Sequence, residues 1–145
     1  MTAQERSMWI EHLAPDECWE LLRSPPTGRL GVLVDSAPEI YPVNHVVDGG
    51  VILFRSSGGT KWRGFGRNPS VCFEVDGIDE VNATGWSVLV KGRAVVLTDP
   101  EDVRLAELLP LRLWVFEDGT QFVRIAPTEI TGRRIGRSAS LAGTS

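Results

Sequence analysis

Short apolar and β-branched runs separated by turn residues dominate the first half of the chain. Three such runs follow one another, at 29–34, 40–47 and 51–55. Turn residues join the first two at 35–38 (Asp-Ser-Ala-Pro) and the last two at 48–50 (Asp-Gly-Gly). Apolar runs connected by Pro, Asp-Gly and Gly-Gly turns are typical of an antiparallel meander. We therefore predict three consecutive antiparallel strands.

The second half repeats this pattern with longer runs. Strands are predicted at 70–76, at 86–98 and, as a last pair, at 121–125 and 129–133. Gly92, inside the longest run, indicates a bulge or a bend. Strands and helices do not alternate, and no Gly-x-Gly-x-x-Gly motif follows a strand, which disfavours a parallel sheet and a dinucleotide-binding unit.

Helical patterns are short and few. One helix is predicted from Ala14-Pro15 until Ser24-Pro25-Pro26 stops it, and another from Asp99-Pro100 to Pro110, with a third short helix through 62–66. Six or seven strands with two or three short helices predict a mainly β protein, an antiparallel barrel with small helical additions.

The length of the chain indicates how many domains it forms, and its net charge indicates which partners are disfavoured. The 145 residues correspond to one domain, which we place at 1–137, followed by a Ser/Ala/Gly-rich tail at 138–145 that we expect to be disordered. The net charge of −4 and the pI near 5.2 argue against nucleic acid as a partner. The sequence shows neither a secretion signal nor a run of about 20 apolar residues, so we expect a cytoplasmic protein that does not enter a membrane.

Cysteine and carboxylate positions do not suggest a metal site. Cys18 and Cys72 lie far apart, and both are expected to be small buried residues. Glu74, Asp76 and Asp79 alternate like the solvent face of a strand. We predict that the protein holds no metal.

The segment 51–61 (VILFRSSGGTK) carries the clearest binding pattern. A predicted strand ends at Arg55-Ser56, glycines follow, and Thr60-Lys61 open the predicted short helix. Two cations, several hydroxyl groups and backbone N–H groups at a helix start are what a phosphate monoester requires. A basic strand end followed by an exposed loop explains the same residues equally well, so this pattern alone leaves both interpretations open.

An ordered set of segments resembles the FMN-binding split barrels related to pyridoxamine 5'-phosphate oxidase, from about Pro15 to Arg134. The segments are Gly28-Arg29-Leu30-Gly31, Tyr41-Pro42-Val43-Asn44, Phe54-Arg55-Ser56 with Gly59-Thr60-Lys61, Val71-Cys72-Phe73-Glu74-Val75-Asp76, Gly85-Trp86-Ser87-Val88-Leu89-Val90-Lys91-Gly92 and Ile130-Thr131-Gly132-Arg133. The resemblance implies a six-stranded antiparallel split β-barrel of Greek-key type. It also implies a homodimer with two FMN molecules at the subunit interface.

The resemblance assigns roles to three groups of residues. The FMN phosphate would be held by Arg55, Ser56, Thr60 and Lys61. The isoalloxazine ring would lie over Pro42, Val43 and Asn44, and Trp86 and Ser87 would approach the cofactor near the interface. Neighbouring strand residues face opposite ways, so we expect Asn44 rather than Val43 to offer a side-chain contact.

The implied activity is a two-electron hydride transfer between FMN and a small organic substrate. No catalytic side chain is identified, because the flavin carries the chemistry. In related nitroimidazole-resistance proteins a histidine stands at the position of Arg55, so reduction of nitroimidazoles by that route is disfavoured.

Two alternatives remain open. The same fold could use the deazaflavin F420, with Arg133, Arg134 and Arg137 binding its acidic tail. A flavin- or haem-binding carrier or sensor without turnover would, for haem, need His45 as axial ligand. His45 could otherwise donate a proton beside a flavin, but we favour a strand residue hydrogen-bonded at the barrel surface. The five tryptophans (9, 19, 62, 86 and 114) are expected in the core or at the dimer interface, with Trp114 in a region that could reach the partner's flavin.

Overall fold

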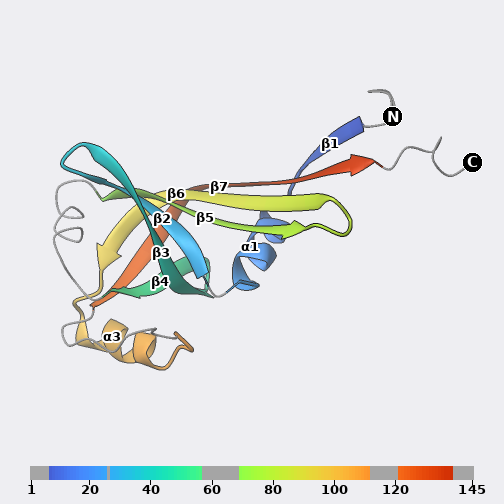
Figure 1. The fold of residues 1–145 in the computed structure, drawn as a ribbon. Helices are drawn as coiled ribbons and strands as arrows, with labels where there is room; N and C mark the ends of the chain where they lie inside the picture. Colours follow the sequence, from blue (N-terminus) through green and yellow to red (C-terminus); the bar gives the residue numbers. More distant parts are fainter. Residues whose placement is uncertain (1–6, 26, 57–68, 112–120, 139–145) are drawn as a thin grey trace, which may run out of the picture.

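The computed structural model describes residues 7–25, 27–56, 69–111 and 121–138. Within these ranges the chain forms seven strands and two helices (Figure 1). In chain order they are β1 Ser7–His12, α1 Pro15–Arg23, β2 Thr27–Val34, β3 Ala37–Asp48, β4 Val51–Ser56, β5 Ser70–Asp79, β6 Thr84–Val96, α3 Pro100–Glu107 and β7 Gln121–Ser138. The predicted helix at 62–66, Trp114 and the tail beyond Ser138 lie outside the described residues.

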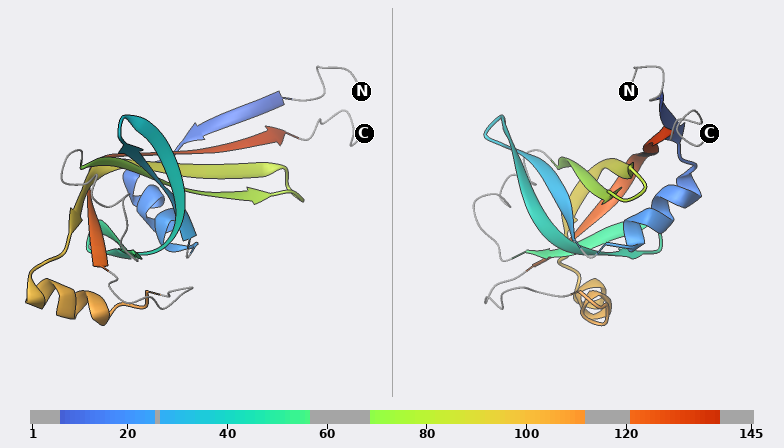
Figure 2. Two further views of the ribbon diagram at one scale, coloured as in Figure 1. Left: turned by 60° about the vertical axis from the view of Figure 1, so that its left-hand side comes forward. Right: turned by 45° about the vertical axis from the view of Figure 1, so that its right-hand side comes forward.

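Six strands close into an antiparallel ring. Their order is β7-β4-β3-β2-β5-β6, and β6 pairs with β7 again to complete the circle. The seventh strand, β1, pairs with the distal part of β7. The β5–β6 hairpin, β7 and β1 extend together beyond the ring, while α3 lies at the opposite end of the molecule from the two termini (Figure 2). The predicted mainly β, six-stranded antiparallel barrel is confirmed.

Alternation along the strands places the core inside the ring. Leu30, Phe54, Phe73 and Val88 are fully buried, and α1 adds Leu22 to the same cluster. Alternate residues of a strand point to opposite faces, so each strand contributes one apolar row to this interior. The ring is therefore filled by side chains, and ligands must bind on its outer face or at its ends.

The cysteines follow the same rule with different outcomes. Cys18 of α1 is buried in the core, as predicted. Cys72 is exposed, so the expectation of a second buried cysteine is wrong. Its neighbours Val71 and Phe73 point into the ring, and alternation therefore directs Cys72 outward.

Two tight turns connect the strands of the meander. Asp35 and Ser36 have φ of 49° and 67°, and Gly49 and Gly50 have φ of 57° and 84°. Two consecutive residues with positive φ match the type I′ hairpin, whose twist fits paired strands. The first turn is shorter than the predicted 35–38 segment, because β3 already begins at Ala37.

One continuous strand replaces the predicted last strand pair. β7 runs unbroken through Pro127, where two strands were expected. The register pairs Lys91 with Glu129 and then Gly92 with Pro127, so Thr128 is an extra residue on β7. The Thr128 hydroxyl donates a hydrogen bond to the Lys91 carbonyl oxygen at 3.1 Å. The irregularity predicted at Gly92 is confirmed, and it also accommodates a proline inside a strand.

The sequence pattern missed β1. Met8 and Ile10 are 67% and 58% exposed, so this strand lacks an apolar row facing a core. Its anchor is Trp9, whose ring lies over Gly136 of β7: a Cβ at Gly136 would come within 2.4 Å of the ring. A strand held mainly by backbone pairing and one aromatic contact gives little periodic signal.

Two absences apply to the described part of the chain. None of its helices has the length and apolar character needed to cross a membrane. No cluster of three or more His, Cys, Asp and Glu side chains in these ranges has a metal-binding arrangement.

We predict that Gly92→Ala lowers the free energy of unfolding by about 1–3 kcal/mol. A Cβ at Gly92 would lie 2.4 Å from the Ala126 carbonyl oxygen, a backbone atom that cannot turn aside. Denaturant unfolding of the variant measures the loss. Gly85→Ala on the same strand is the matched control, because its Cβ would meet nothing closer than 3.5 Å. Equal stability of the two variants would contradict the tight packing at the bulge.

Candidate functional site

Seven of the nine predicted site residues lie on three strands. β3 carries Pro42, Val43 and Asn44, the end of β4 carries Arg55 and Ser56, and β6 carries Trp86 and Ser87. Thr60 and Lys61 lie outside the described residues.

Strand alternation divides these residues between the two faces of the ring. Val43 and Trp86 pack against the core, and Ser56 is only 6% exposed. Pro42, Asn44, Arg55 and Ser87 occupy the alternate, outward positions. The outer face of β3 and β4 therefore presents Pro42, Asn44 and Arg55, whereas Ser56 faces away from Arg55.

Arg55 is fixed on the outer face by an aromatic ring. Its guanidinium carbon lies 4.9 Å from the centroid of the Phe122 ring, on the neighbouring strand β7. A cation over an aromatic face is stabilised by the ring quadrupole. Arg55 thus keeps a cation at the end of β4.

Asn44 is oriented by the strand beside it. The Thr27 hydroxyl donates a hydrogen bond to Asn44 Oδ1 at 2.9 Å, across the register pair of β2 and β3. This contact directs the amide toward the outer face. The Asn44 side chain thus lies on the outer face and Val43 packs against the core, while the predicted contact of Asn44 with a flavin ring stays a prediction.

An ion-pair cluster that sequence reasoning missed lies beside Pro42. Arg29 Nη1 lies 3.1 Å from Glu74 Oε1 and 2.9 Å from Asp76 Oδ2, joining β2 to β5. Arg29 also stands opposite Pro42 in the register. Glu74 and Asp76 were expected only as a solvent face. Their partner is 45 residues away or more in the chain, and only the strand register brings it close.

The two carboxyl groups of this cluster titrate in opposite directions. Partial burial, followed by the contact with Asp76, raises the pKa of Glu74. The hydrogen bond from Glu74 lowers the pKa of Asp76, and the Arg29 guanidinium lowers it further. The titrations of the two carboxyl groups are therefore linked, with the proton retained more readily on Glu74 than on Asp76.

Ser87 belongs to a separate polar cavity of about 460 Å³. Its lining residues are His12, Glu74, Ser87, Leu89, Thr131, Gly132 and Arg133. Ser87 stands between Asp76 and Arg133 in the register, and His12 lies on the far side of Arg133. The cavity thus gathers a carboxyl group, hydroxyl groups, an imidazole and a guanidinium from the four adjacent strands β5, β6, β7 and β1.

The three C-terminal arginines do not share one face. Arg133 lines the polar cavity, while Arg134 turns to the other side of β7 and lies 3.8 Å from Glu11. Arg137 lies four residues after Arg133 on β7, so strand alternation directs both side chains to the same side of the strand. An acidic cofactor tail could not meet all three on one surface, which removes the observation that favoured F420.

His45 lies inside the barrel. It is 5% exposed, its Nε2 lies 2.8 Å from the Leu22 carbonyl oxygen, and its ring meets the edge of Phe73 with centroids 4.8 Å apart. Nε2 must be the donor, because a carbonyl oxygen only accepts. The hydrogen bond was predicted, but its position at the barrel surface was wrong. A role as proton donor or haem ligand on the outer face is not supported.

A closed antiparallel ring of six strands with small helical additions places this chain in the split-barrel class of small proteins. The family model of pyridoxamine 5'-phosphate oxidase matches residues 14–134, and the chain belongs to this family. An uncharacterized protein of Mycobacterium tuberculosis is 35% identical over 131 residues, covering 87% of this chain and 86% of that protein.

Solved structures agree with this assignment. The FAD binding protein of Mycobacterium smegmatis is 38% identical, with a TM-score of 0.72 over 86% of this chain and 97% of that one. A FAD-binding protein of Mesorhizobium loti is 25% identical, with a TM-score of 0.80 over 90% of this chain and 99% of that one. Both likenesses support the assignment of the chain to the pyridoxamine 5'-phosphate oxidase family.

We predict opposite pH dependences for two substitutions in the ion-pair cluster. Because the pKa of Glu74 is raised in the folded state, the stability that Glu74 contributes falls as the pH rises through that folded-state pKa. The Glu74→Gln variant does not titrate at this position. Its stability relative to wild type should therefore increase between about pH 4, near the ordinary glutamate pKa, and neutrality. Because the pKa of Asp76 is lowered, its contribution is present at neutral pH and lost in acid. Asp76→Asn should therefore be less stable at neutral pH and approach wild type in acid. Denaturant unfolding across this range is the measurement, and parallel profiles for both variants would contradict the coupling.

Proposed function

We propose that the protein binds FMN noncovalently and catalyses a two-electron hydride transfer with a small organic substrate. The observation that carries the proposal is the common outer surface of Pro42, Asn44 and Arg55 on β3 and β4. This surface joins an apolar strand segment to an amide and a cation, in the order in which a flavin nucleotide needs them.

The donor set fits the chemical parts of FMN. The Arg55 guanidinium, retained beside Phe122, would pair with the phosphate. The Asn44 amide would meet the polar edge of the ring, and Pro42 would lie beneath its apolar part. Thr60 and Lys61 complete the phosphate contacts in the sequence-based hypothesis. Ser56, which faces inward, would contribute through its backbone rather than through its hydroxyl group.

The flavin supplies the redox chemistry when bound, accepting and donating the hydride. The chain supplies binding, orientation and exclusion of water from the ring. No described side chain on this surface is assigned as an acid or base. A carrier or sensor without turnover uses the same binding residues, and steady-state reduction assays on the FMN-loaded protein separate the two.

FMN is favoured over FAD by the sequence motif, whereas two similar proteins are named for FAD. Arg55 and Lys61 together match a terminal phosphate dianion. Titrating the protein with FMN and FAD side by side decides which nucleotide it prefers.

We predict that Arg55→Ala and Lys61→Ala each weaken FMN binding about ten- to a hundredfold, because charge-assisted hydrogen bonds contribute about 1.5–3 kcal/mol each. Flavin fluorescence titration measures the change. Riboflavin, which lacks the phosphate, should bind weakly and be indifferent to both changes. Equal losses for the two ligands would show that the residues act through structure.

Two further variants test whether the loss of FMN affinity arises at the phosphate of the nucleotide. Arg104→Ala removes an exposed arginine that is paired with Glu101 on α3 and has no role in the proposed site, and it should leave FMN binding unchanged. Asn44→Ala should weaken FMN and riboflavin equally, because its contact is with the ring that both share. A loss confined to FMN would contradict the placement of Asn44.

We further propose a homodimer, because the outer wall of one barrel cannot enclose a flavin. Ile78 and Val81 are 81% and 94% exposed, which leaves apolar surface for a second copy. Light scattering at micromolar concentration should give twice the chain mass, 15.9 kDa, with an interface of about 800 Å² per partner or more. A monomer that binds FMN tightly would contradict this.

A further inference from the structure

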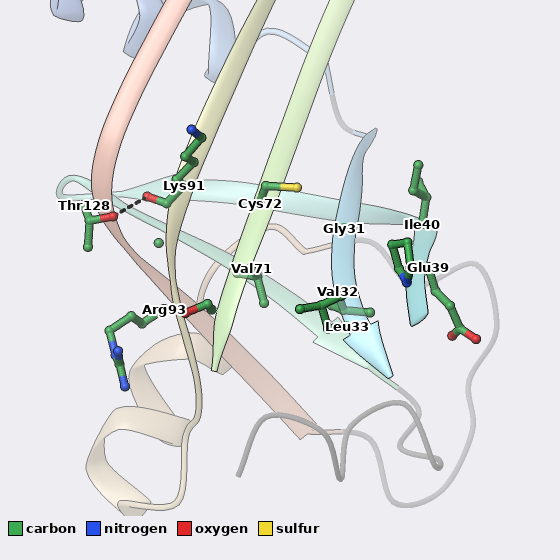
Figure 3. Close-up of a pocket in the computed structure, with 13 residues that line it drawn as sticks. Gly31, Val32, Leu33, Glu39, Ile40, Val71, Cys72, Lys91, Arg93 and Thr128 are labelled. Atoms are coloured by element: carbon green, nitrogen blue, oxygen red, sulfur yellow. Dashed lines mark hydrogen bonds between the residues drawn. The ribbon is translucent and has the colours of Figure 1, made fainter. Parts of the chain in front are cut away.

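A second, apolar cavity opens where two strands of the ring separate. β2 and β5 pair at only three positions, Arg29–Glu74, Leu30–Phe73 and Gly31–Cys72. Beyond Gly31 they diverge, and a cavity of about 730 Å³ lies between them (Figure 3). We call it the split cavity. Its volume is within the range of small-molecule sites.

The walls of the split cavity are mainly aliphatic, with Glu39 as a carboxyl residue in the lining. The aliphatic lining residues are Val32 and Leu33 of β2, Val71 of β5, and Pro38 and Ile40 of β3. Leu33 and Ile40 remain 41% and 71% exposed. Covering such surface with an apolar ligand is favourable by about 25 cal/mol per Å². The walls therefore select a ligand with a hydrocarbon body.

The rim on the β6 side is cationic. Lys91 lies 3.5 Å from Glu129 and is partly neutralised. Arg93, opposite Ser70 in the register, makes no ion pair with any described residue. Arg93 is among the lining residues, and Figure 3 shows its side chain extending away from Val71, with the guanidinium at the outer end. An acid group would thus be held at the mouth, where it stays partly hydrated.

The cavity lies next to the surface proposed for the flavin. Ile40 and Pro42 are two residues apart on the same face of β3, about 7 Å along the strand. A ligand in the cavity would therefore border a flavin ring lying over Pro42.

We propose that the split cavity binds a small apolar organic acid, with its hydrocarbon body between β2 and β5 and its acid group at Arg93. The assignment of this acid as the redox substrate rests on the proposed function; the binding itself does not. Arg93 is then the residue that selects acids over neutral compounds of the same shape.

The test uses a fluorescent dye and its neutral analogue as probes. Anilinonaphthalene sulfonate should bind the full-length protein, and phenylnaphthylamine, which lacks the sulfonate, should bind more weakly. Arg93→Gln should weaken the sulfonate dye about five- to tenfold and leave the neutral dye unchanged. Arg137→Gln, at another exposed arginine, is the matched control and should change neither. Equal affinities of both dyes for wild type and Arg93→Gln would overturn the proposal.

Cys72 locates the bound probe. It lines the cavity and is exposed, whereas the only other cysteine, Cys18, is fully buried. A thiol reagent should therefore label Cys72 alone, and saturating sulfonate dye should slow labelling several-fold. Cys72→Ser should abolish the labelling. Dye binding without protection of Cys72 would place the dye elsewhere and overturn the proposal. Protection without dye that depends on protein concentration would show a second copy in the cavity and would also overturn it.

FMN titration of Arg93→Gln separates this proposal from the proposed function. Unchanged FMN affinity with weakened dye binding supports an acid site beside the flavin. A parallel loss of FMN and dye would make Arg93 part of the flavin site and overturn a separate acid site. If wild type binds the dye at Cys72 but does not bind FMN, the acid site stands and the flavin proposal fails.

Discussion

The structure depends on β7, the strand that closes the ring. This 18-residue strand pairs with β4 through its first residues, with β6 along most of its length and with β1 at its end. Because β6 and β4 both bind it, the sheet has no open edge at this point. The bulge at Thr128 lets one strand follow the curvature that closure requires, and Pro127 is tolerated only because the ladder is already irregular there. Without this continuous strand the interior would lose its wall.

Closure forces the alternation that organises every candidate site. Once one face of each strand is committed to the core, consecutive residues cannot cooperate through their side chains. Arg55 and Ser56 are separated in this way, and so are Val43 and Asn44. Binding surfaces on this fold must be assembled across strands, as Arg29 meets carboxylates of β5.

Local chemistry determined what the sequence could predict. The Asp48-Gly49-Gly50 turn, the start of α3 at Asp99-Pro100 and the irregularity at Gly92 are each set by a few neighbouring residues, and each was predicted correctly. The errors arose where distant strands decide the outcome. β1 has no periodic row of buried apolar residues, and β7 was predicted as two strands because of Pro127. Cys72 is exposed because its neighbours Val71 and Phe73 point into the ring and alternation directs Cys72 outward. The Arg29 cluster and the split cavity depend on a register between β2 and β5 that no sequence pattern encodes.

The distribution of charge explains how an acidic chain can present sites for anions. The net charge of −4 says little about any one position, because several cations are already neutralised: Arg29 by two carboxylates, Arg134 by Glu11 and Lys91 by Glu129. An anion binding at one of these would have to displace a carboxylate, and exposed ion pairs, though worth only about 0–1 kcal/mol, would still reduce the gain. Arg55 contacts the face of the Phe122 ring, which holds its guanidinium on the outer side of β4. Arg93 differs from Arg29, Arg134 and Lys91 because no described carboxylate forms an ion pair with it. Among these four cations, Arg93 is therefore the one that an anionic ligand could meet without first displacing a carboxylate.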